Sequence, residues 1–95
     1  MAKVIWSPDA LDDMEALAGY IARDSADQAA LFVSRIIEAA EVLARFPRLG
    51  RPAPEMQDPD WRQVLVGAYR VIYRMAGDAV RINAVIHCAR QRRSR

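Results

Sequence analysis

The feature that most constrains this chain is a pair of apolar runs separated by Gly77-Asp78. A glycine-containing dipeptide between two runs rich in β-branched and aromatic residues predicts a hairpin, with strands over residues 69–75 and 79–87. In a small domain, such a hairpin needs one apolar face that packs against other elements. The remaining residues are therefore expected to supply further strands and a layer that covers them.

Two helices are predicted upstream of the hairpin. Ser7 is a good N-cap and Pro8 a good first helical residue, so a helix is expected from here to about Asp24. Ser25 then opens an S-x-x-Q capping box, which predicts a second helix that ends at residues 46–47, a Phe-Pro pair. The apolar stripes expected in the core are Leu11, Met14, Leu17, Ala18 and Ile21 in the first helix, and Phe32, Ile36, Ala39 or Ala40, and Leu43 in the second, with Val33 and Ile37 beside it.

The order of the elements predicts the fold class. Residues 3–6 and 61–66 are β-prone, whereas residues 51–60 contain three prolines and are predicted to form a loop. The resulting order is β-α-α-β-β-β, an α+β fold in which a helical hairpin packs on one face of a small, mostly antiparallel sheet. A chain of 95 residues has no room for a second core, so residues 1–95 are expected to form a single domain.

The register of the hairpin predicts one apolar face and one cationic face. With Gly77-Asp78 as the turn, the pairs expected to point toward the helices are Tyr73 and Ile82, Val71 and Ala84, and Tyr69 and Ile86. The pairs expected on the other face are Arg74 and Arg81, Ile72 and Asn83, and Arg70 and Val85, together with His87, and with Arg62 if its strand continues the pattern. Two arginines that face each other repel unless an anion lies between them, so the pattern indicates a functional cationic face rather than a merely solvated one.

The charged residues are divided unevenly along the chain. Residues 1–60 carry six basic and eleven acidic side chains, whereas residues 61–95 carry eight arginines and one aspartate, so the net charges are −5 and +7. This asymmetry predicts an acidic or nucleic-acid partner for the C-terminal half. The alternative is that the arginines of the tail only keep the chain in solution.

Composition excludes several classes of protein. A hydrophobic fraction of 53% is too high for a disordered chain, and no apolar run approaches the ~18 residues of a membrane span. No secretory leader opens the sequence, and the lone Cys88 fits a reducing compartment. Cys88 and the adjacent His87 make a poor ligand pair for zinc, so we expect no metal or other cofactor. The preceding features together predict no membrane contact and a cytoplasmic location.

Five short motifs, spread over the whole chain, carry a resemblance to one family. They are W-S-P-x-A-x-x-D from Trp6 to Asp13, Y-I-A from Tyr20 to Ala22, F-P-x-x-G-R from Phe46 to Arg51, Y-R-V-I-Y-R from Tyr69 to Arg74, and V-I-H-x-A-R from Val85 to Arg90. In this order they resemble the ParE/RelE superfamily, the toxins of type II toxin–antitoxin systems in bacteria and archaea. The fold of that superfamily is the β-α-α-β-β-β arrangement expected above.

One branch of the superfamily, the RelE-like toxins, cuts mRNA in the ribosome and needs a general base, a general acid and cations around the phosphate. The resemblance implies that Arg70 and Arg90 contact the phosphate in such a toxin, with His87 as the remaining acid or base. However, the only lysine is Lys3, and the C-terminal tyrosine of that branch has no counterpart. This mechanism is therefore the alternative.

The other branch, the ParE-like toxins, poisons DNA gyrase, stabilises cleaved DNA, arrests growth and can stabilise plasmids. The missing lysines and tyrosine favour this branch, in which no residue is catalytic and His87 is structural or a contact residue. The residues then expected to bind the target or the antitoxin are Arg62, Arg70, Arg74, Arg81, His87, Arg90, Arg92 and Arg93. A third hypothesis, a nucleic-acid binder that uses the arginine face alone, ranks last because Tyr69 and Tyr73 are expected on the core face, where no base can stack on them.

Both branches imply the same partner, a cognate antitoxin that is ParD-like or similar. Its acidic, largely disordered C-terminal segment is expected to lay a helix across the helical hairpin and an extended piece along the sheet, where carboxylates would pair with the arginines. Operator DNA is expected to be contacted only through the antitoxin, because no helix of this chain has the pattern of a recognition helix.

Overall fold

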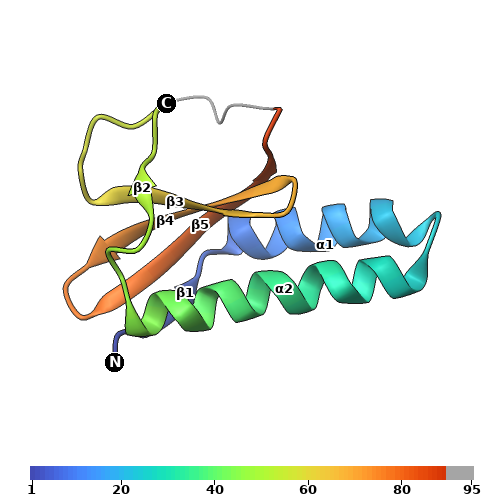
Figure 1. The fold of residues 1–95 in the computed structure, drawn as a ribbon, viewed down its shortest axis with the longest axis horizontal. Coiled ribbons are helices and arrows are strands. Elements are labelled where there is room, and N and C mark those ends of the chain that lie inside the picture. The colour runs from blue at the N-terminus through green and yellow to red at the C-terminus, as the bar shows by residue number, and fades with distance from the viewer. Residues whose placement is uncertain (90–95) are drawn as a thin grey trace.

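The computed structural model describes residues 1–89 as two helices packed on one five-stranded sheet (Figure 1). The elements are β1 (Lys3–Trp6), α1 (Pro8–Ala22), α2 (Ala26–Arg45), β2 (Arg51–Pro52), β3 (Trp61–Val66), β4 (Tyr69–Ala76) and β5 (Ala79–His87). The strands follow the order β1-β5-β4-β3-β2, in which β1 is parallel to β5 and every other pair is antiparallel. The predicted α+β fold is therefore confirmed. Within residues 1–89, the structure adds one element to the prediction, the short edge strand β2, which lies where a loop was expected.

The two predicted N-caps explain where the helices begin. The hydroxyl oxygen of Ser7 accepts a hydrogen bond from the Ala10 N–H at 3.1 Å, and that of Ser25 accepts one from the Gln28 N–H at 3.1 Å. Each bond satisfies one of the N–H groups that a helix leaves open in its first turn. Helix α1 ends at Ala22, two residues before the predicted end.

The main core lies between the helices and the inner face of the sheet, the face that the helices cover. Its buried members are Ala10, Phe32, Ile36, Ala40, Leu43, Val71, Tyr73, Val80, Ile82 and Val85. The predicted stripe of α2 is confirmed at four of these positions, but Ile37 is exposed. In α1 the prediction for Leu11 is wrong, since its side chain is 50% exposed and Ala10 is buried instead. Neighbouring helical residues lie about 100° apart, so a stripe centred on Ala10 turns Leu11 toward solvent.

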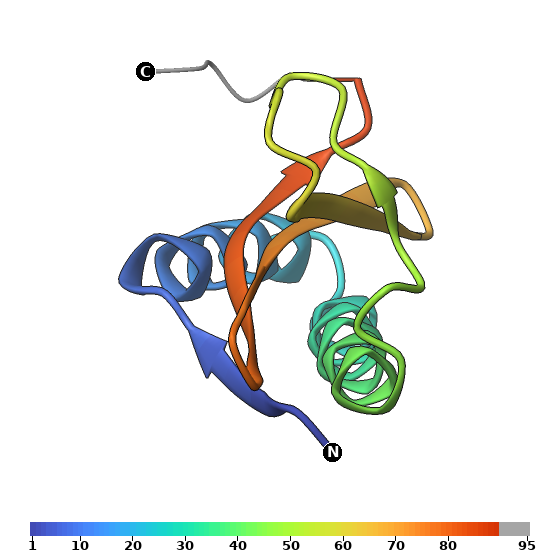
Figure 2. The same ribbon diagram turned by 90° about the vertical axis from the view of Figure 1, so that its left-hand side faces the viewer.

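A second, smaller core covers part of the outer face, the face opposite the helices. Ala53, Ile72 and Ala84 are buried there, and Met56, Trp61 and Ile86 pack around them. Figure 2 shows the connection over residues 53–60 on the side of the sheet away from the helices. This loop therefore covers part of the outer face, a packing that the sequence did not predict.

A β-bulge between Ile72 and Tyr73 changes the register of the hairpin. On the turn side, Tyr73 pairs with Ile82 and Arg74 with Arg81, as predicted. Beyond the bulge, the observed partners are Ile72 and Ala84, Val71 and Val85, Arg70 and Ile86, and Tyr69 and His87, so the four predicted pairs are wrong. Asn83 is the extra residue, and one extra residue moves all later side chains of β5 to the opposite face.

The F-P-x-x-G-R motif is held by Tyr73, which is fully buried under the connection between α2 and β2. The Tyr73 hydroxyl donates to the Pro47 carbonyl at 2.6 Å and accepts from the Gly50 N–H at 2.9 Å. The Arg62 guanidinium adds a bond from Nη1 to the Gly50 carbonyl at 2.8 Å. The motif therefore has a structural role, because it fixes the path of the chain out of α2.

Replacing Tyr73 by Phe is expected to lower the free energy of unfolding by about 2 kcal/mol, since two buried backbone groups lose their partner.

Burial raises the pKa of Tyr73, against the opposing effects of the Gly50 hydrogen bond and the Arg62 charge. The folded state therefore keeps the phenol protonated at about pH 10, where the unfolded chain ionises. The contribution of Tyr73 to the free energy of unfolding is fully present below this pH and is lost as the pH rises further. Urea denaturation at neutral pH and at about pH 11 should show that the free energy of unfolding falls less in the variant than in the parent protein over this pH range. An equal fall in the two proteins would contradict this role of Tyr73.

Candidate functional site

Arg70 lies on the outer face of β4 and is enclosed by the protein. Its guanidinium donates to both carboxylate oxygens of Glu55, at 2.5 and 3.0 Å, and to the Gln63 Oε1 at 2.7 Å. The side chains of Arg70 and Glu55 are each only 7% exposed. The hydrogen bond with Glu55 raises the pKa of Arg70, although burial opposes it. The arginine expected to contact a partner is thus bound by a carboxylate of its own chain.

Arg74 and Arg81 lie on the same outer face as Arg70 but at its open end, as predicted. They are direct partners across β4 and β5, and both are exposed. Arg74 lies 3.6 Å from the Asp58 carboxylate, and both side chains are more than 40% exposed. Its guanidinium is also 5.9 Å from the centre of the Trp61 ring. An exposed pair at this distance contributes at most about 1 kcal/mol, so Arg74 remains accessible to another anion.

The prediction that Arg62 shares this face is wrong. Arg62 pairs with Tyr73 across β3 and β4 and therefore points toward the helices. Its Nη1 donates to the carbonyls of Gly50 and Arg48 at 2.8 and 3.3 Å. Arg62 supports the connection from α2 instead of contributing to the outer cationic face.

The prediction that His87 shares the arginine face is also wrong, because the bulge in β5 turns it to the inner face. Its ring packs edge-on against Tyr69 with centroids 5.5 Å apart. The His87 Nδ1 accepts a hydrogen bond from the Ala89 N–H at 3.1 Å. It lines a hollow of about 610 Å³ between α1 and the end of β5, to which Asp13, Leu17 and Tyr20 also contribute.

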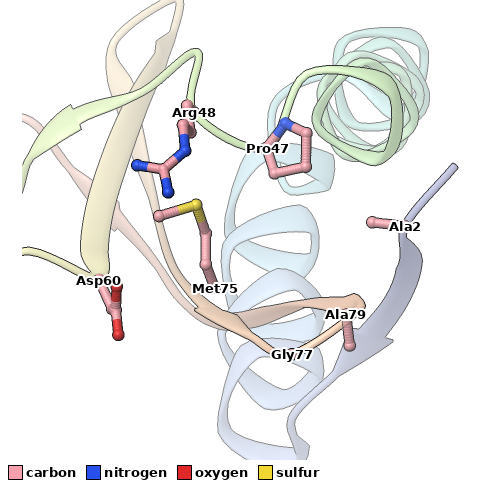
Figure 3. Close-up of a pocket in the computed structure, with 7 residues that line it drawn as sticks. All are labelled: Ala2, Pro47, Arg48, Asp60, Met75, Gly77 and Ala79. Atoms are coloured by element: carbon pink, nitrogen blue, oxygen red, sulfur yellow. The ribbon is translucent and has the colours of Figure 1, made fainter.

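The other predicted residues do not extend this site within the described chain. Arg90, Arg92 and Arg93 lie outside residues 1–89. A hollow of about 490 Å³ near the β4–β5 turn is lined by Arg48, Asp60 and Met75 (Figure 3) and contains none of the predicted site residues. Within residues 1–89, no three His, Cys, Asp or Glu side chains gather as metal ligands, and no helix is long and apolar enough to cross a bilayer.

Three residues of the outer face were not found from the sequence: Glu55, Asp58 and Trp61. Glu55 and Asp58 belong to the proline-containing segment, and their positions depend on how that segment folds back over the sheet. One signal was available. Ile72 alternates with Arg70 and Arg74 on β4, and an apolar residue between two arginines indicates that something covers this part of the face.

Comparison with known proteins identifies the family. Residues 4–92 match the family described as ParE toxin of type II toxin-antitoxin system, parDE. Toxin RelE2 of Caulobacter vibrioides is 34% identical over 90 residues, a match that covers 95% of this chain and 99% of that protein.

Solved structures share the fold. A chain of the chromosomal ParDE TA system from P. aeruginosa has a TM-score of 0.75 at 20% identity, covering 92% of this chain and 96% of that chain. The YoeB/ParE toxin from Agrobacterium tumefaciens has a TM-score of 0.61 at 18% identity, covering 90% of this chain and 96% of its own. The family match over residues 4–92 and the 34% identity to a relative of nearly the same length show that the chain belongs to the ParE toxin family of type II toxin–antitoxin systems.

Proposed function

We propose that this protein is a non-enzymatic toxin that inhibits DNA gyrase and arrests growth, and that a cognate antitoxin neutralises it by direct binding. The observation that carries the proposal is the separation of Arg70 from His87. An RNA-cleaving site needs a cation on the phosphate and an acid or base within hydrogen-bond reach of the same nucleotide. Here the two residues lie on opposite faces of the sheet, with Arg70 paired to Glu55 and His87 beside Tyr69 and α1.

The energetics of the Arg70–Glu55 pair support the same conclusion. A phosphate that reached Arg70 would have to displace a carboxylate that makes two hydrogen bonds in a buried setting. Breaking a buried ion pair typically costs 3–5 kcal/mol. Arg70 therefore acts as a structural residue in this proposal, unlike the phosphate-contacting arginine of the RelE-like branch.

The hollow beside His87 is the surface that we assign to the antitoxin. Leu17 and Tyr69 give it apolar walls, and the side chain of Tyr20 is 67% exposed at its rim. A helix or extended segment that laid an apolar side chain here would bury this exposed surface, as in helix-in-groove recognition. This placement does not itself cover the outer face of the sheet, along which the extended piece of the antitoxin is expected to lie.

Replacing His87 by Gln is expected to leave gyrase inhibition unchanged, because no proton transfer is required of this side chain. A plasmid supercoiling and cleavage assay with purified gyrase, ATP and the folded protein measures this directly, and an antitoxin peptide should reverse the inhibition. If His87 were a general acid or base, the same substitution would lower ribosome-dependent mRNA cleavage by about 10²–10⁴-fold.

A protein that is folded and toxic in cells, but leaves gyrase untouched while it cuts mRNA on ribosomes in a His87-dependent manner, would replace this proposal by the RelE-like mechanism.

A further inference from the structure

We propose that the open half of the outer face binds the phosphodiester backbone of single-stranded DNA through Arg74, Arg81 and Lys3. Such binding is a direct contact of this chain with nucleic acid and does not require gyrase. The residues that would make it belong to a row of side chains that crosses four strands of the sheet, or lie beside that row.

The row follows from the strand pairing. Ile5 on β1 pairs with Arg81 on β5, Arg81 pairs with Arg74 on β4, and Arg74 pairs with Trp61 on β3. The strand neighbours of Ile5, Arg81 and Arg74 belong to the main core, so these three side chains point away from the helices. Trp61 points the same way, since it packs against the small core of the outer face. Adjacent strands lie about 4.8 Å apart, so the row is about 14 Å long, with two cations in its centre and an apolar residue at each end.

Lys3 extends the cationic surface beside this row. It precedes Ile5 by two residues on β1 and therefore lies on the same face, where it is exposed. Within residues 1–89, neither Lys3 nor Arg81 has an ion-pair partner, and the one acidic neighbour of Arg74 is Asp58 at 3.6 Å. The 53–60 loop thus neutralises the covered half of the face at Arg70 and leaves the open half positively charged.

The composition of the row favours a nucleic-acid strand over an acidic peptide. Two arginines held opposite each other repel, and the two free oxygens of a phosphodiester, like those of a carboxylate, can each accept from a different guanidinium. The residues at the two ends of the row therefore decide between these occupants. Trp61 is half-buried, with the Arg74 guanidinium 5.9 Å from its ring centre, and its exposed part adds aromatic surface beside the cations, as in single-strand binders. Tyr69 and Tyr73 lie on the core side of the sheet and cannot stack with bases, whereas Trp61 lies on the outer face. The apolar ends of the row suit the sugars and bases that flank each phosphate.

The test is a titration of the full chain with a fluorescently labelled, single-stranded DNA 12-mer, followed by anisotropy over a range of salt concentrations. With two or three phosphate contacts, the logarithm of the affinity should fall with the logarithm of salt with a slope of about −1.4 to −2. Arg81→Glu should weaken binding at least about tenfold at low salt, since it replaces an attraction by a repulsion at the centre of the row. Arg35→Glu on α2 changes the net charge equally and is the matched control, expected to have a much smaller effect.

Three outcomes would overturn the inference. Equal losses in Arg81→Glu and Arg35→Glu would mean that only net charge matters, and no loss in Arg81→Glu would place any DNA contact elsewhere on the chain. Competition by polyglutamate that equals competition by unlabelled DNA would identify an acidic peptide as the occupant. Because the titration contains no gyrase, each result can be read whether or not gyrase proves to be the target.

Discussion

Replacing Gly50 by Ala is expected to lower the free energy of unfolding by about 3 kcal/mol, the upper end of the range for overpacking. An added Cβ would lie 2.6 Å from the Gln63 carbonyl oxygen and 2.7 Å from the Tyr73 hydroxyl. The first neighbour is backbone of β3, which is paired with both β2 and β4, and the second belongs to a buried ring that is bonded to Gly50 and Pro47. Relieving the clash therefore disturbs either the sheet or the Tyr73 hydrogen bonds. Urea denaturation followed by circular dichroism measures the loss.

Gly19 provides the matched control within the same chain. It lies in the interior of α1, and an added Cβ would meet no atom within 4 Å. The substitution Gly19→Ala should therefore stabilise the protein by up to about 1 kcal/mol, the difference in helix propensity. If Gly50→Ala left the free energy of unfolding unchanged or raised it, the close approach of Gly50 to Tyr73 would be refuted.

Replacing Glu55 by Gln is expected to cost about 3–5 kcal/mol, because it leaves the buried charge of Arg70 without its carboxylate. The two bonds from Arg70 to Glu55 tie the 53–60 loop to β4, and the small core around Ile72 depends on that loop. Chemical denaturation should report the loss in the free energy of unfolding. Hydrogen exchange is expected to show that the amides of the loop lose protection first.

Asp58→Asn is the control for this prediction, since it removes the exposed partner of Arg74. The expected change is no more than about 1 kcal/mol, as for other surface ion pairs. The double variant Glu55→Leu with Arg70→Met should recover most of the lost stability, because an apolar pair can replace a buried ion pair. Equal effects of Glu55→Gln and Asp58→Asn would show that the Arg70–Glu55 pair is not buried in solution.

These two predictions also bear on the function. If the Arg70–Glu55 pair carries several kcal/mol, a target or antitoxin has no access to Arg70 while the protein is folded. The accessible cations of the described outer face then include Lys3, Arg74 and Arg81, of which Arg74 has Asp58 of the 53–60 loop 3.6 Å away. Variants at Arg70 that abolish toxicity would therefore have to be checked for folding before any contact is inferred.

Much of the fold was predictable because its signals are local. The caps at Ser7 and Ser25 act within one helical turn, and the Gly77-Asp78 turn fixes the pairing of the residues next to it, Arg74 with Arg81 among them. Such signals need no knowledge of the rest of the chain. The order of the elements and the fold class follow from them.

The candidate site was predicted less well, because it depends on one inserted residue and one loop. The bulge at Asn83 leaves no sign in the alternation of apolar residues, since both Ala84 and Val85 can occupy a core position. A slip of one residue nevertheless moves His87 from the arginine face to the helix face. Arg62 was misplaced for a related reason, because the faces of β3 are set by its pairing with β4.

The sequence by itself thus determined the helices, the strands, the turn and the presence of arginines on β4 and β5. Only the tertiary structure decided which of those arginines can meet a partner. Glu55 lies fifteen residues before Arg70, and no periodicity links them. A long-range ion pair forms where the chain folds back and excludes water, so the same side-chain type is structural at Arg70 and exposed at Arg81.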